Sequence, residues 1–196
     1  MKHRLLAQIA VLLLVLFSPA VSYAQQGTAV EKASSLIQEF MAETGAPGIA
    51  VSVGVKGQLA WSEGFGYADV EQRVPVWPSI TRFRVGSVAK PMTALALAQV
   101  YEQGRLNLDV PVQRYVPSFP EKEGTITARL LAGHLAGIRH YQGDEYFSQK
   151  RYLTVLEGLT IFQDNPLLHS PGTKFSYSSY GWNLISAVVE AASGQD

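Results

Sequence analysis

The spacing of apolar residues predicts a helix and then a β-hairpin in the first third of the chain. Apolar side chains recur every three or four residues over 30–41, and Gly45 is expected to end that helix. The segments 48–55 (GIAVSVGV) and 59–69 are typical of strands, and the Lys-Gly pair between them is typical of a turn. We therefore expect two antiparallel strands after the first helix.

After the hairpin the pattern predicts only helices and loops. Helices are predicted from Ser87 to about Gln103, from Thr127 to Gly137, over 153–162 and over 179–193, with proline-containing loops over 70–81, 106–124 and 169–175. A two-stranded hairpin is marginally stable and leaves bare edges, so the sheet needs more strands than this chain supplies. We expect an α+β fold, an antiparallel sheet flanked by helices. Residues 25–196 would be its amino-terminal part, with one hairpin and the helical region.

The first 24 residues have the composition of a secretory signal peptide. A basic start (KHR) precedes an apolar stretch over 5–17, and the small residues Ser22 and Ala24 suit a signal peptidase. The stretch is shorter than the roughly 20 residues that span a bilayer, so we predict cleavage after Ala24, with an uncleaved anchor as the alternative. The mature chain is expected in a periplasm or the medium, without a stable membrane span.

Charge and cysteine content exclude several functional classes. Sixteen Lys and Arg balance sixteen Asp and Glu, so the chain lacks the strong positive field of proteins that bind nucleic acid or acidic lipid. The chain contains no cysteine, which excludes disulfides, thiolate catalysis and cysteine-ligated zinc. The expected partner is a small-molecule or peptide substrate, and no metal or organic cofactor is implied.

The candidate nucleophile is Ser87, in the segment FRVGSVAK (83–90). Lys90 follows it by three positions, so the two side chains share one face of a helix that begins at Ser87. A partly desolvated lysine amine can accept the proton of a serine hydroxyl, and backbone N–H groups at a helix start can stabilise an oxyanion. The competing interpretation is that Ser87 is an N-cap and Lys90 a solvated lysine.

A second candidate lies in GTKFSYSSYGWN (172–183), where Tyr177 follows a Pro-Gly turn and precedes a helix. A phenol near a lysine can transfer protons if the positive charge lowers its pKa. The alternative is a tyrosine that packs in the core or caps the helix.

Two histidines offer other chemistry. A zinc site from His134, His140 and Asp144 is disfavoured because the histidines fall in different elements. A Ser87–His140–Asp144 triad is disfavoured because the chain has no G-x-S-x-G elbow. We expect His134 on a helix beneath the cleft and His140 as a hydrogen-bond donor in a loop.

Three blocks of the sequence, over 85–120, 126–141 and 166–194, together resemble the serine beta-lactamase-related family. That family includes class C beta-lactamases, D-Ala-D-Ala carboxypeptidases and esterases. The stretch HLAGIRHY and the run PVQRYVPSFP are most similar to its mitochondrial serine beta-lactamase-like branch and the bacterial relatives of that branch. The resemblance implies a beta-lactamase/transpeptidase-like fold.

By this resemblance Ser87 corresponds to the acylated nucleophile and Lys90 to the lysine of the S-x-x-K motif. Tyr177 corresponds to the tyrosine of the Y-x-N motif. This implies that Tyr177 acts first as the general base and later as the acid that protonates the leaving group. Ser179 stands where many members have the asparagine that contacts the substrate, and the shorter serine favours peptidase or esterase activity over beta-lactam recognition. The family's third motif, K-T-G or H-x-G on a strand of the cleft, is expected beyond Asp196.

These observations predict an exported serine hydrolase that forms a covalent acyl-enzyme on a peptide, an ester or a beta-lactam. Because the third motif and the C-terminal strands are missing, we expect a fragment with impaired activity. The alternative is a non-catalytic protein of the same fold, either a degenerate remnant or a scaffold that binds a partner.

Overall fold

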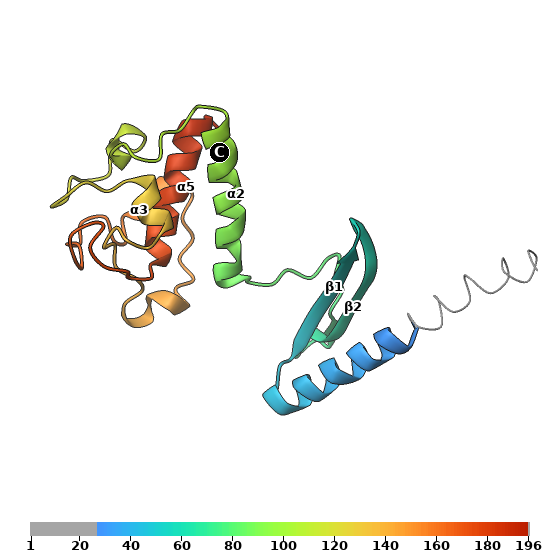
Figure 1. The fold of residues 1–196 in the computed structure, drawn as a ribbon. Helices are drawn as coiled ribbons and strands as arrows, with labels where there is room; N and C mark the ends of the chain where they lie inside the picture. Colours follow the sequence, from blue (N-terminus) through green and yellow to red (C-terminus); the bar gives the residue numbers. More distant parts are fainter. Residues whose placement is uncertain (1–26, 196) are drawn as a thin grey trace, which may run out of the picture. The chain divides into compact units, whose positions relative to one another are not determined.

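The computed structural model describes residues 27–195, which divide into two compact units that meet between Phe83 and Arg84 in the sequence (Figure 1). The predicted signal peptide, residues 1–24, lies outside the described residues. Within 27–195, no helix combines the length and the apolar character needed to cross a membrane.

The first unit contains a helix over residues 27–44 and a three-stranded antiparallel sheet. The strands β1 (Gly48–Val55) and β2 (Gln58–Asp69) form the expected hairpin. A third strand, β3 (Val74–Pro75), pairs with β2 in a segment that the sequence assigns to a loop. Two residues are too few to show an alternating pattern, and a proline is tolerated because β3 lies at the sheet edge.

The second unit is built around its last helix, α5 (Ser179–Ser193), where Leu184, Ile185 and Val188 are fully buried. The helices that pack against α5 are α2 (Ala89–Glu102), α3 (Ala128–Ala132) and α4 (Val155–Leu159) (Figure 1). Three 3₁₀ helices complete the unit: η1 (Gly86–Val88), η2 (Val112–Arg114) and η3 (Gly143–Phe147). This packing fixes the start of α5 relative to the start of α2.

Hydroxyl caps set three helix starts in the second unit. The side chains of Thr127, Thr154 and Ser178 each accept a hydrogen bond from a backbone N–H three residues later, at the starts of α3, α4 and α5. The bounds of α5 agree with the prediction, and Gly194 ends it in the left-handed conformation (φ 63°). Both α3 and α4 are shorter than predicted, and α3 stops early because His134 has a left-handed backbone (φ 58°).

Candidate active site

Ser87 and Lys90 lie at the junction of η1 and α2. The sequence predicts a single helix from Ser87, whereas the structure has a 3₁₀ turn there and begins the α-helix at Ala89. The spacing still brings the two side chains together, because Lys90 Nζ donates a hydrogen bond to Ser87 Oγ at 3.1 Å. Gly86, the first residue of η1, has φ 53°, which glycine adopts without the strain that a side chain would add.

Tyr177 reaches the same point from the residues just before α5. Its phenol oxygen lies 2.6 Å from Ser87 Oγ, within the range for direct proton transfer. The Nζ atom of Lys90 lies 4.9 Å from the centre of the Tyr177 ring. Polar contact with Lys90, followed by the hydrogen bond with Ser87, lowers the pKa of Tyr177. This environment favours the phenolate, which is the form that can accept a proton.

Ser179, the first residue of α5, completes the cluster. Its hydroxyl accepts a hydrogen bond from Lys90 Nζ at 3.0 Å, so one amine contacts the hydroxyls of both Ser87 and Ser179. Ser179 is buried and Ser87 is exposed, which leaves the group open to solvent on the nucleophile's side. The structure therefore joins all four residues selected from the sequence in one hydrogen-bonded group, while their roles in a reaction stay predictions.

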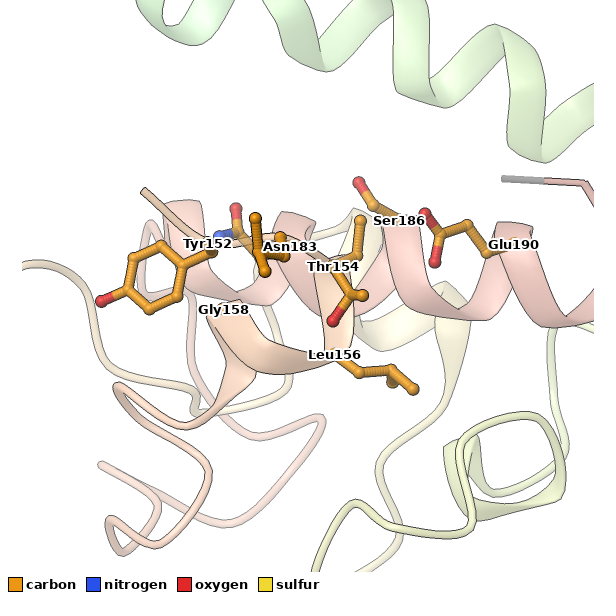
Figure 2. A pocket seen from close by; sticks show the side chains of 9 residues that line it. Tyr152, Thr154, Leu156, Gly158, Asn183, Ser186 and Glu190 are labelled. Atoms are coloured by element: carbon orange, nitrogen blue, oxygen red, sulfur yellow. The ribbon is translucent and has the colours of Figure 1, made fainter. Parts of the chain in front are cut away.

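A pocket of about 350 Å³ opens beside this group, with Ser87, Lys90 and Ser179 in its lining. A larger pocket of about 650 Å³ lies along α5, and Figure 2 shows its lining side chains from α5 and from the segment around α4. The two pockets share Asn183 and Ser186. We assign the candidate site to the smaller pocket, because the nucleophile and its neighbours line it.

Two histidines hold the segment that carries Tyr177 and Ser179. The Nδ1 atom of His134 accepts a hydrogen bond from the Ser178 backbone N–H at 3.1 Å, and that of His140 accepts one from the Ser179 N–H at 3.2 Å. The Tyr177 ring packs on both, with ring centres 4.5 Å from His134 and 5.3 Å from His140. Burial first, and then the positive charge of Lys90, lowers the pKa of each imidazole.

These contacts correct the roles that the sequence suggests for the histidines. His134 lies in the turn after α3 and not on a helix, and His140 Nδ1 accepts a hydrogen bond where a donor was predicted. A Ser87–His140–Asp144 triad is wrong, because the Nδ1–H of a triad histidine donates to a carboxylate, whereas this Nδ1 faces a backbone N–H. Over residues 27–195, no three His, Asp or Glu side chains are placed to hold a metal ion.

A partly buried ion pair holds the loop that carries His140. Arg139, only 7% exposed, donates to both carboxylate oxygens of Glu145, at 2.8 and 2.9 Å, and to the carbonyl oxygen of His140. The Tyr180 hydroxyl also donates to Glu145, at 2.9 Å. These hydrogen bonds, chiefly those from Arg139, lower the pKa of Glu145 to about 2. Sequence reasoning missed this pair, since nothing local distinguishes it from two solvated charges.

Known proteins resemble this chain in sequence and in structure. The family model Beta-lactamase matches residues 33–196. The human mitochondrial serine beta-lactamase-like protein LACTB is 35% identical over 235 residues, covering 85% of this chain and 43% of that protein. The structure of the octameric penicillin-binding protein homologue from Pyrococcus abyssi is 33% identical, with a TM-score of 0.69 over 85% of this chain and 40% of that one.

A second similar structure is that of EstCE1, a hydrolase with promiscuous acyltransferase activity. It is 28% identical, with a TM-score of 0.74 over 87% of this chain and 49% of that one. The chain thus spans less than half the length of each of these relatives.

Proposed function

Because the chain belongs to the beta-lactamase family and has its α+β fold, we propose that it carries the nucleophile and the base of a serine hydrolase acting through an acyl-enzyme at Ser87. The observation that carries this proposal is the position of Ser87 Oγ, 2.6 Å from the Tyr177 oxygen and 3.1 Å from Lys90 Nζ. A hydroxyl placed between a base and a cation is activated as a nucleophile.

In the acylation step, the Tyr177 phenolate takes the proton of Ser87 while Oγ forms a bond to the carbonyl carbon of the substrate. Lys90 donates to Oγ and stabilises the negative charge that develops during attack. The bond to the leaving group then breaks, and the proton held by Tyr177 passes to the leaving oxygen or nitrogen.

In the deacylation step, Tyr177 accepts a proton from water, whose oxygen attacks the acyl carbon. The acid departs as the bond to Ser87 Oγ breaks, and Tyr177 returns the proton to Ser87. The carbonyl oxygen needs hydrogen-bond donors in both steps. The backbone N–H of Ser87 is one candidate donor, because N–H groups in the first turn of a helix have no acceptor within the helix.

For the substrate we propose a carboxylic ester or a peptide in preference to a beta-lactam. The Ser179 hydroxyl is shorter than an asparagine amide and already accepts a hydrogen bond from Lys90. The pocket beside Ser87 is also lined by Tyr141, Tyr146 and Trp182, whose rings favour an apolar acyl group.

Acylation of Ser87 is tested by treating the full-length protein with a fluorescent fluorophosphonate. We expect one labelled band that is lost in Ser87→Ala and kept in Ser35→Ala, which removes an exposed hydroxyl on the first helix. Chromogenic esters, D-amino-acid peptides and beta-lactams, compared by turnover, then identify the substrate class. A folded protein that stays unlabelled would instead support the non-catalytic scaffold or remnant.

We also propose that the chain is exported and cleaved after Ala24, on the evidence of its signal-like composition. The amino-terminal sequence of the protein recovered from the periplasm or medium tests this. A start at Gln25 is expected, and an intact start at Met1 in the cytosol would overturn the proposal.

A further inference from the structure

The hydrogen bonds to Ser178 and Ser179 define the protonation state of two histidine rings. A backbone N–H can only donate, so the Nδ1 atoms of His134 and His140, at 3.1 and 3.2 Å, must each present a lone pair. Both rings are therefore neutral, with the proton on Nε2. In His134 the lone pair goes to the Ser178 N–H at 3.1 Å, because a neutral imidazole has one acceptor nitrogen and the indole nitrogen of Trp182 lies farther away, 3.4 Å from Nε2. The two consecutive N–H groups that the two rings hold lie next to Tyr177 along the chain.

We propose that His134 and His140 are positioning residues, which hold Tyr177 and Ser179 against Ser87 and Lys90 only while both imidazoles are neutral. Protonation of either ring in acid releases this segment and switches the site off. This inference rests on the proposed function, because it assigns the acid sensitivity of that site to two side chains that take no part in the chemistry.

The switch follows from the donors that surround each ring. An imidazolium carries a hydrogen on both nitrogens, so its Nδ1–H would oppose the backbone N–H that it now accepts. Protonation thus replaces the hydrogen bond at the Nδ1 atom of each ring with a repulsive contact.

The charged and titratable groups near the rings do not offset this repulsion. Lys90 acts on both imidazoles with a positive charge, and each ring packs against Tyr177. His140 also packs against Tyr141, and its charge contributes to the lowered pKa of His134. Over residues 27–195, no carboxylate is hydrogen-bonded to either ring, so protonation has no anionic partner there.

The rest of the segment is anchored independently, which makes the release local. The Ser178 hydroxyl donates to the Arg139 carbonyl at 2.7 Å and accepts the Gly181 N–H at 2.9 Å, so the start of α5 keeps its cap in acid. Arg139 is itself fixed by the two hydrogen bonds to Glu145, whose pKa of about 2 keeps it ionised throughout the histidine range. We therefore expect Tyr177 and Ser179 to move while the fold persists.

The test measures how the rate of Ser87 labelling by the fluorophosphonate depends on pH in the full-length protein. In His134→Asn and His140→Asn, the amide oxygen can still accept the backbone N–H but cannot be protonated. Because protonation of either ring releases the segment, we expect the double variant His134→Asn/His140→Asn to retain its labelling rate at pH values where the wild-type protein has lost it. His134→Phe and His140→Phe keep a ring without an acceptor and should be slower at every pH, by about tenfold to a hundredfold.

His169→Asn is the matched control, because His169 contacts Ser170 in a turn and does not touch the Tyr177–Ser179 segment. It should leave the acid limb of the labelling profile unchanged. An acid limb in the double asparagine variant that is the same as in the wild type would overturn the proposal.

A measurement that needs no activity separates this inference from the proposed function. Nitrogen-15 chemical shifts of labelled histidines report which ring nitrogen carries the proton, and both rings should show an unprotonated Nδ1 at neutral pH. A protonated Nδ1 in either ring at neutral pH would overturn the inference even if Ser87 is labelled. Absence of labelling at every pH, with the expected tautomers, would instead reject the hydrolase function.

Discussion

The hydroxyl oxygens of Ser87 and Tyr177 lie 2.6 Å apart, although 90 residues separate them in the sequence. Ser87 is placed by the turn before α2, and Tyr177 by the residues before α5. Because α2 and α5 pack against each other, the two helix starts, and with them the two oxygens, are held together by the core of the second unit. Substitutions at this contact should therefore change the chemistry more than the stability.

Tyr177→Phe removes the phenol oxygen and keeps the ring that packs on His134. Acylation of Ser87 should slow by about 10²- to 10⁴-fold, the usual contribution of a general base. The midpoint of urea unfolding should change little, because the lost hydroxyl is at a partly exposed site. Tyr101→Phe, on the exposed side of α2, is the control. Labelling at the wild-type rate in Tyr177→Phe would exclude Tyr177 as the base.

Lys90→Met keeps the aliphatic stem of the side chain and removes its positive charge. The contact with Lys90 is the main cause of the lowered pKa of Tyr177, so this pKa should rise toward its ordinary value near 10. The tyrosinate absorbance of the variant, measured during a pH titration, should then appear at higher pH than in the wild type. Lys32→Met, on the exposed first helix, should give the wild-type titration curve.

Glu145→Gln leaves the buried Arg139 guanidinium without its anionic partner. We expect a loss of about 2 kcal/mol in the free energy of unfolding at neutral pH, less than for a fully buried pair because Glu145 is partly exposed. The folded-state pKa of Glu145 is about 2, below its ordinary value, so the wild-type contribution is present above about pH 4.5 and lost as the pH falls toward 2.

Urea unfolding at a series of pH values tests both parts of this prediction. The difference in the free energy of unfolding between the wild type and Glu145→Gln should shrink as the pH falls from 5 to 2. Glu39→Gln, on an exposed position of the first helix, should match the wild type at every pH. If this difference in free energy stays constant with pH, the ion pair is not its source.

Two glycine substitutions should have opposite effects on the second unit. Gly137 has a left-handed backbone (φ 76°), and an added Cβ would overlap the carbonyl oxygen of His169. Gly137→Ala should therefore lower the free energy of unfolding by roughly 1–3 kcal/mol. Gly158 lies inside α4 with open space around it, so Gly158→Ala should be neutral or stabilising by up to about 1 kcal/mol. Thermal unfolding of the wild type and of both variants measures these two changes in stability.

Local sequence determined the elements whose ends are set by neighbouring residues. The turn between β1 and β2, the hydroxyl cap of Thr127 and the glycine after α5 act within a few residues, and each is where the spacing predicts it. The same holds for Ser87 and Lys90, because one helical turn is enough to bring them into contact. The strand β3 escaped prediction because two residues carry no periodicity.

Only the tertiary structure decided how the histidines and the ion pair are used. The sequence shows that His134 and His140 lie near each other along the chain, but whether a ring nitrogen donates or accepts depends on the group in front of it. That group is the backbone N–H of a segment about 40 residues later, brought there by the packing of α3 on α5. A hydrogen bond is directional over about 3 Å, so it is set by the packed fold and not by local spacing.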